Sequence, residues 1–222
     1  MAEQKTPVVI LGAGAYAAVI HEILTARRDI MVIGCTDKAL GQSDRAIDEG
    51  VSLHILGDDD ILPELAEKNP GLRAVLALGP ELMDVRQKLI DTLRRENIPP
   101  LTVLHPSAVV SSRAKMGEGT VVREQGVVSA GSVIGPCCLI NLGASIDHDA
   151  HLGANVYVGQ GAQISSHVQV GESVVIEMGA SINSRVTIGQ GATIIGGAFV
   201  NTDVPDKAVM VGVPARLVRY ED

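Results

Sequence analysis

A histidine between two acidic residues, Asp147-His148-Asp149, is the segment whose residue types best suit proton transfer. A neighbouring carboxylate can fix the tautomer of an imidazole and raise its basicity, which suits a general base working near neutral pH. His148 is therefore the candidate base. The alternative is a solvated histidine at a turn with two incidental acidic neighbours, and the spacing alone leaves both interpretations open.

A second candidate site is the Gly12-Ala13-Gly14 turn, which lies between a predicted strand at 7–11 and a predicted helix at 16–27. Glycines let a ligand approach the backbone, and a helix N-terminus offers N–H donors and a partial positive charge to a phosphate. Asp37 follows the second predicted strand, where acidic residues contact a ribose or base in such folds. Ala17 replaces the third glycine of the dinucleotide motif, so a merely structural tight turn fits the pattern equally well.

Aliphatic residues recur at every sixth position in the second half of the chain, from Leu104 to Val200, and a small or thin residue stands two positions before each. A longer period of eighteen residues is superimposed on this one, in Gly117, Gly135, Gly153, Gly171 and Gly189. A period of six is typical of a β-solenoid and differs from the 3.6-residue period of a helix. The simplest geometry is a three-sided coil with aliphatic side chains inside and a glycine-bearing corner in each coil.

The first half of the chain lacks this period. Its apolar runs predict buried strands, and its amphipathic segments predict helices. The strands are expected at 7–11, 30–35 and 73–78, a segment at 101–104 leads into the solenoid, and the helices are expected at about 16–27, 58–67 and 80–96. Strands alternating with helices imply a small parallel sheet with helices on its faces. The predicted domains are therefore 1–101 and 102–222.

The other histidines and the cysteines do not suggest a metal site. The positions eighteen residues before and after His148 hold Ala130 and Ser166, and both His151 and His167 are expected to face outward. No metal is therefore predicted. The cysteines, Cys35, Cys137 and Cys138, have no metal-type or disulfide spacing and are expected to be reduced thiols of a cytoplasmic protein.

Composition excludes several classes of protein. The chain is 46% hydrophobic and 20% charged, which is typical of a globular protein. A net charge of −8 with no basic run argues against a nucleic-acid partner. No stretch of apolar residues is long enough to predict a membrane span.

The order of these features resembles the sialic acid O-acetyltransferase-like family of hexapeptide-repeat sugar acyltransferases. The resemblance is carried by the Gly-x-Gly domain, the solenoid, the segment from Asn141 to Asp149, and the terminal motifs at 203–206 and 211–215. It is strongest to N-acetyltransferases of nucleotide-linked 4-amino-4,6-dideoxy sugars, of the bacillosamine and perosamine type. It implies a Rossmann-like first domain, a left-handed parallel β-helix, and a homotrimer with active sites between subunits.

The resemblance also implies roles for individual residues. Acetyl-CoA would be the co-substrate, and His148, supported by Asp149, would accept a proton as the sugar amine attacks the thioester directly. The residues implied for the nucleotide sugar are Gly12, Ala13, Gly14, Tyr16, Asp37, Lys38 and Asn141, and those implied for the coenzyme are Tyr157, Met178 and Gly196. Tyr16 and Tyr157 stand where family members often carry histidine, so the contacts carried over at these two positions are in question.

Two alternative functions remain open. The same base would serve the O-acetylation of a sugar such as sialic acid. A non-catalytic solenoid binding module is also conceivable, but it leaves both the acidic neighbours of His148 and the first domain unexplained.

Overall fold

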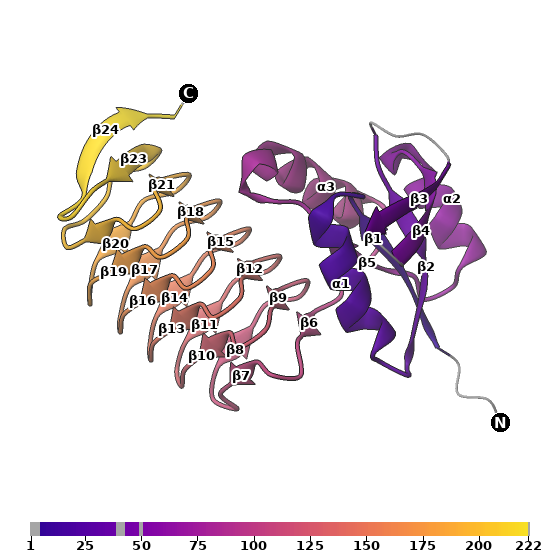
Figure 1. Ribbon diagram of the computed structural model, residues 1–222, viewed down its shortest axis with the longest axis horizontal. Coiled ribbons are helices and arrows are strands. Elements are labelled where there is room, and N and C mark those ends of the chain that lie inside the picture. The colour runs from indigo at the N-terminus through magenta and orange to yellow at the C-terminus, as the bar shows by residue number, and fades with distance from the viewer. Residues whose placement is uncertain (1–4, 39–42, 49–50, 222) are drawn as a thin grey trace. The chain divides into compact units, whose positions relative to one another are not determined.

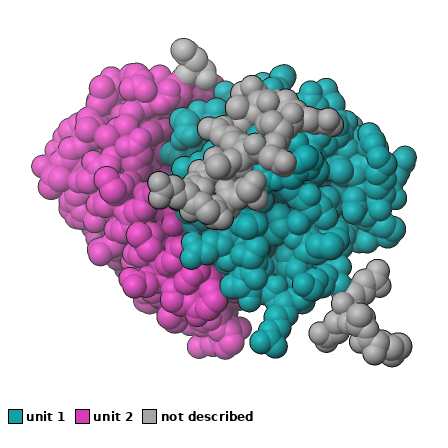
Figure 2. Space-filling view, turned by 45° about the vertical axis from the view of Figure 1, so that its right-hand side comes forward, with its two compact units in different colours: residues 1–103 teal, residues 104–222 magenta. Residues whose placement is uncertain are grey.

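The computed structural model describes residues 5–38, 43–48 and 51–221. The chain divides into two compact units after Val103, two residues beyond the boundary drawn from the sequence. Figure 2 shows the two units in different colours. Each unit is described by itself below.

The first unit is a five-stranded sheet with helices. Its elements are β1 (Thr6–Leu11), α1 (Ala15–Thr25), β2 (Ile30–Thr36), β3 (Ser43–Asp48), β4 (Val51–Gly57), η1 (Asp59–Ile61), α2 (Leu62–Lys68), β5 (Arg73–Leu76), η2 (Pro80–Leu82) and α3 (Met83–Arg95). The strand order is β3-β4-β2-β1-β5, and only β3 runs antiparallel to its neighbour (Figure 1). The predicted strands and helices are present, but the β3–β4 hairpin was not predicted.

The centre of this sheet is buried on both faces, which is typical of parallel strands covered by helices. All side chains from Val8 to Leu11 are fully buried, and Ile20 and Leu24 of α1 are also in the core. Because β1 and β2 pair in parallel up to Leu11 and Thr36, the residues that follow these two strands meet at one edge of the sheet.

The second unit consists of stacked coils whose strands are two residues long. These are β6 (Val103–Leu104), β7 (Val109–Val110), β8 (Lys115–Met116), β9 (Val121–Val122), β10 (Val127–Val128), β11 (Val133–Ile134), β12 (Leu139–Ile140), β13 (Ser145–Ile146), β14 (His151–Leu152), β15 (Tyr157–Val158), β16 (Gln163–Ile164), β17 (Gln169–Val170), β18 (Val175–Ile176), β19 (Ser181–Ile182), β20 (Thr187–Ile188), β21 (Thr193–Ile194) and β22 (Phe199–Val200). A hairpin of β23 (Ala208–Val211) and β24 (Arg216–Tyr220) follows.

These strands form the three faces of a prism. Face I consists of β7, β10, β13, β16, β19 and β22, face II of β8, β11, β14, β17 and β20, and face III of β6, β9, β12, β15, β18, β21, β23 and β24. From β7 to β22 each strand pairs in parallel with the strand eighteen residues later, as Ile146 pairs with Ile164, whereas Thr193 of β21 pairs with Val209 of β23. In every coil the chain therefore turns from face III to I, from I to II and from II to III, at corners that we name III–I, I–II and II–III (Figure 1).

The six-residue aliphatic period fills the interior of the prism. Ile140, Ile146, Ile164 and Ile176 are each at most 2% exposed. Burial of one such side chain stabilises the fold by roughly 1.5–3 kcal/mol, so the stacked aliphatic columns are the main source of stability of this unit.

The eighteen-residue glycine period has a steric cause. A Cβ atom on Gly135 would lie 2.5 Å from the carbonyl carbon of Gly153 in the next coil, and one on Gly117 would lie 2.4 Å from that of Gly135. Successive coils therefore approach each other too closely at corner II–III to admit a side chain.

In the described part of the chain, none of the helices has the length and apolar character needed to cross a bilayer.

Candidate active site

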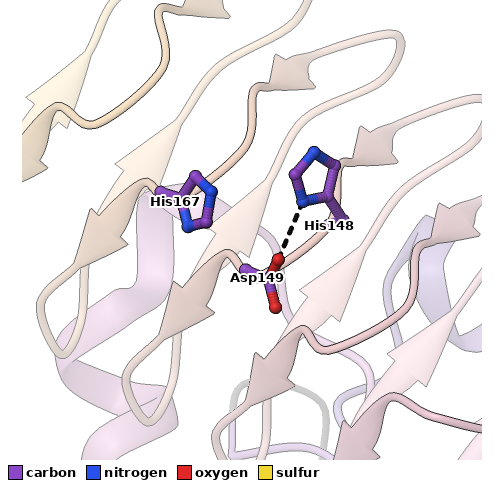
Figure 3. Close-up of side chains that lie close together, drawn as sticks. All are labelled: His148, Asp149 and His167. Atoms are coloured by element: carbon purple, nitrogen blue, oxygen red, sulfur yellow. Dashed lines mark hydrogen bonds and ion pairs between the residues drawn. The ribbon is translucent and has the colours of Figure 1, made fainter.

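His148 and Asp149 lie at corner I–II, in the turn between β13 and β14, and both side chains are about half exposed. The Nδ1 atom of His148 is 2.8 Å from Oδ2 of Asp149 (Figure 3). The backbone N–H of His148 donates to Oδ1 of Asp147 at 2.7 Å. The two carboxylates thus contact different parts of His148. Asp149 contacts the ring, and Asp147 accepts from the backbone N–H.

The backbone at this corner places the Asp149 carboxylate. Asp149 has φ of 56°, in the left-handed region, and its backbone N–H donates to the carbonyl oxygen of Ala130 at 3.1 Å. Aspartate enters this region more readily than most residues. A Cβ atom built on Gly131 would lie 2.2 Å from Oδ1 of Asp149, so the carboxylate occupies the space that any side chain at position 131 would need.

The electrostatics of the pair favour a basic imidazole. The hydrogen bond to Asp149 raises the pKa of His148 above its ordinary 6.5; desolvation opposes this, and the charges of Asp147 and Asp149 add to it. The same hydrogen bond lowers the pKa of Asp149. With the carboxylate ionised, Nδ1–H of the neutral imidazole donates to Asp149 and Nε2 carries the lone pair, which is the arrangement of a general base.

His167 of the next coil joins this corner, and it was not predicted from the sequence. Its ring centroid lies 5.3 Å from that of His148, with the rings nearly perpendicular, and its backbone N–H donates to the carbonyl oxygen of His148 at 3.2 Å. The residue eighteen positions after His148 is Ser166, which has no imidazole. The sequence does hold a sign of this neighbour, because His167 is eighteen residues after Asp149 and residues with that offset lie in adjacent coils.

We predict that Gly131→Ala lowers the pKa of His148 back toward 6.5, because the added methyl group displaces the Asp149 carboxylate from the imidazole. NMR titration of the ring protons measures this directly. Gly143→Ala is the matched control, since Gly143 has a similar φ of 65° against 76° but has no atom within 4 Å of the added Cβ. Equal titration of His148 in both variants would contradict the assigned role of Gly131.

The predicted nucleotide residues meet at the edge of the sheet in the first unit. The N–H of Ala13 donates to Oδ2 of Asp37 at 3.0 Å, and Gly14 is the N-cap residue of α1. Gly12 has φ of 101°, and a Cβ there would lie 2.8 Å from Leu78, so the fold itself requires this glycine. A Cβ on Gly14 would contact nothing, so the fold leaves open space there.

The two remaining predicted contacts of this unit differ in their surroundings. Tyr16, in the first turn of α1, is half-buried. Lys38, directly after Asp37, is exposed. Both lie near the loop in sequence, and their roles stay predictions.

The residues implied for the coenzyme do not lie at the corner of His148. Met178, which is 66% exposed, and Gly196 lie at corner III–I in successive coils. Tyr157 belongs to β15 on face III and is buried. In one chain, therefore, the width of face I separates the Met178 corner from the His148 corner.

Asn141 also lies at corner III–I rather than beside His148, and it is fully buried. Its Oδ1 accepts from Arg123 at 3.2 Å, and its Nδ2 has no hydrogen-bond partner among the described residues. Within one chain Asn141 and His148 therefore lie at different corners, and the implied role of Asn141 in binding the nucleotide sugar stays a prediction.

A groove on face I adjoins the histidine corner. Its polar lining is Ser129, Ser145, Asp147, Gln163 and Ser165, drawn from three successive coils. The lining offers hydroxyl, amide and carboxylate groups, which suit a ligand rich in hydroxyl groups.

Comparisons with known proteins agree with this architecture. Residues 7–93 match the family model of the PglD N-terminal domain. UDP-N-acetylbacillosamine N-acetyltransferase of Bacillus subtilis (strain 168) is 31% identical over 115 residues, which are 52% of this chain. The matched region spans only half the length of that relative.

Two solved structures match almost the whole chain. One is a histidine-to-asparagine mutant of perosamine N-acetyltransferase from Caulobacter crescentus in complex with CoA and GDP-perosamine, with 34% identity, a TM-score of 0.87, and coverage of 96% of this chain and 97% of that one. The other is the acetyltransferase domain of PglB from Neisseria gonorrhoeae FA1090 in complex with acetyl coenzyme A, with 28% identity, a TM-score of 0.86, and coverage of 96% and 100%.

These matches establish the predicted fold class, a Rossmann-like unit followed by a left-handed parallel β-helix. They also establish the resemblance drawn from the sequence motifs. The chain belongs to the family of hexapeptide-repeat sugar N-acetyltransferases that includes perosamine N-acetyltransferase and UDP-N-acetylbacillosamine N-acetyltransferase.

Proposed function

We propose that this protein transfers the acetyl group of acetyl-CoA to the 4-amino group of a nucleotide-linked 4-amino-4,6-dideoxy sugar, with His148 as general base. The observation that carries the proposal is the 2.8 Å contact between Nδ1 of His148 and Asp149 at an exposed corner, which leaves Nε2 available to a substrate. Relatives that match nearly the whole chain were crystallised with CoA and GDP-perosamine, or with acetyl coenzyme A.

The proposed reaction is a direct transfer. The amine nitrogen attacks the thioester carbonyl carbon, a C–N bond forms and the C–S bond breaks. The proton lost by the amine passes to Nε2 of His148 and then to the departing thiolate, which leaves as CoA thiol. An unprotonated amine is a good nucleophile, so a covalent acyl-enzyme is not required. Asp149 stabilises the imidazolium that forms in between.

The nucleotide of the sugar is assigned to the edge of the sheet in the first unit. The N-terminus of α1 is suited to a phosphate, because the backbone N–H groups and the partial positive charge at the start of a helix favour an anion. Asp37, held by the N–H of Ala13, suits a donor group on the ribose or base. The open space at Gly14 supports the close approach of a ligand to this backbone.

A panel of UDP-, GDP- and dTDP-linked 4-amino sugars, incubated with acetyl-CoA, tests the proposal. We expect thiol release and an N-acetylated product with at least one amino sugar, and no reaction with the matched sugar that carries a hydroxyl at the same carbon. Release with the hydroxyl sugars alone would replace N-acetylation by O-acetylation. Specific binding of a nucleotide sugar without any release would favour a non-catalytic module.

The pH dependence of the reaction reports on the pair of His148 and Asp149. Only neutral His148 accepts a proton, so activity is lost as the pH falls through its raised pKa, and the acid limb of kcat/KM lies above 6.5. We predict that Asp149→Asn moves this acid limb to lower pH. We also predict that it lowers kcat/KM by less than roughly 100-fold, which is the smallest loss expected when the general base itself is removed. An unchanged acid limb in Asp149→Asn would argue against this pair as the titrating unit.

We further propose that the active site is shared between copies in a homotrimer. His148 and the coenzyme residues Met178 and Gly196 lie at different corners of one prism, so a second copy must supply the missing corner if both serve one reaction. We predict that co-expression of His148→Asn with Gly196→Phe chains yields more activity than either variant alone, measured after purification through two different tags. Mixed oligomers that stay as inactive as the parents would contradict a shared site.

A further inference from the structure

The corner of His148 holds three potential metal ligands from two coils. One ligand atom each from His148, Asp149 and His167 lies within 4.8 Å of the other two. Figure 3 shows the three side chains lying close together, from the turns of two coils. The close pairs are the 2.8 Å contact of His148 with Asp149 and the 5.3 Å ring contact of His148 with His167.

Two imidazole nitrogens and a carboxylate oxygen form a donor set that suits zinc and similar divalent transition metals. Zinc–ligand distances of about 2.0–2.2 Å place neighbouring ligand atoms about 3.3–3.5 Å apart in a tetrahedral site. A pair of ligand atoms at the 4.8 Å limit would therefore need to close by about 1.5 Å, which side chains at a turn can do by rotation. A fourth position would remain open to water.

The local charges are of both signs. The carboxylate of Asp149 is in contact with the ring of His148, so the set contains one acidic ligand. Arg113 and Arg185 belong to the same corner, in an earlier and a later coil. The donor atoms and their spacing, and not an excess of negative charge, therefore favour a metal ion here.

We propose that His148, Asp149 and His167 bind a divalent transition-metal ion of the zinc class, and that the bound ion blocks the imidazole of His148. An ion bound at Nε2 would occupy the lone pair that a general base needs, and an ion bound at Nδ1 would force the ring proton onto Nε2, so neither form could accept a proton from the substrate. The metal site follows from the geometry of the three side chains, whereas the inhibition rests on the function proposed above.

Calorimetric titration of ZnCl₂ into the substrate-free protein tests the site without reference to activity. We expect one ion per chain, and a Kd that rises at least about tenfold in His167→Gln, since even partners outside the metal shell change affinity by about 10- to 100-fold. His151→Gln is the matched control, because His151 is an exposed histidine on β14 outside the cluster. Absence of binding, or equal affinity in wild type and His167→Gln, would overturn the metal site.

Co²⁺ gives a second readout. Wild type and His151→Gln are expected to give the same visible bands with Co²⁺. In His167→Gln the bands are expected to need more Co²⁺ and to change in position and intensity, because one ligand is lost. Bands in His167→Gln that match those of wild type at the same Co²⁺ concentration would exclude His167 as a ligand.

The proposed inhibition by zinc is tested by measuring the N-acetylated product. Thiol release is not a suitable measure here, because zinc also binds the released thiol. We expect Zn²⁺ to inhibit wild type and His151→Gln, and chelation to restore the rate. His167→Gln, compared with its own metal-free rate, should require at least about tenfold more Zn²⁺. Calorimetric binding without inhibition would overturn the block of His148 while leaving the site intact. Calorimetric binding in a protein that acetylates none of the sugars would count against the proposed function alone.

Discussion

His148→Asn is expected to lower kcat/KM by about 100- to 10,000-fold, the range over which a positioned general base accelerates proton transfer. Asparagine keeps a donor for Asp149 but lacks an atom equivalent to Nε2. Because His148 is half exposed and outside the prism core, the melting temperature should change little. Steady-state rates with the amino sugar identified by the panel measure the effect. The variant should also lose the acid limb set by His148 and retain only the pH dependence of the substrate amine.

The control for this prediction is His151→Gln, three residues along the same coil and exposed. It should keep the wild-type rate and acid limb. Turnover of His148→Asn within a few-fold of wild type would show that the amine transfers its proton without His148, and the base would have to be sought elsewhere.

Gly135→Ala is expected to destabilise the solenoid strongly. The added Cβ would lie 2.5 Å from the backbone of Gly153, so no side-chain rotation can relieve the contact and the two coils must separate. Overpacking typically costs about 1–3 kcal/mol, and a contact with backbone that cannot move aside puts this substitution at about 3 kcal/mol. For a chain of this size that corresponds to a melting temperature lower by about 6–12 °C, measured by circular dichroism at fixed protein concentration.

Gly143→Ala separates this steric effect from backbone strain. Gly143 has φ of 65° and no atom within 4 Å of the added Cβ, so its replacement costs only about 1–2 kcal/mol for the left-handed conformation. Gly135→Ala should therefore melt below Gly143→Ala. The reverse order would mean that the coils have room at position 135 after all.

The solenoid could be predicted from the sequence because residues that are neighbours in this fold are a fixed number of residues apart. The pairing of Ile146 with Ile164 is visible as an eighteen-residue offset, and the close approach at Gly135 is visible as a glycine period. The β3–β4 hairpin had no such signal. The strand at 43–48, SDRAID, alternates too weakly between polar and apolar residues to indicate its pairing.

The candidate site was only partly predictable. The Asp147-His148-Asp149 segment is local, so the contact between His148 and Asp149 could be expected from adjacent residues. His167 was missed because the eighteen-residue period aligns it with Asp149 and not with His148, and the period alone does not show that its ring reaches the imidazole of His148. The position of Asn141, buried at another corner, likewise depends on where the chain turns and not on its distance from His148 along the chain.

The unbroken pairing of each strand with the strand eighteen residues later limits how the length of this protein can change. Loss or gain of six residues would rotate every later segment by one third of a turn about the prism axis, so residues beyond the change would exchange faces. Loss or gain of eighteen would shift the later segments along the axis and keep each on its own face. Genetic change in this region is therefore tolerated in whole coils, and duplication of one coil is the natural step by which such a chain lengthens.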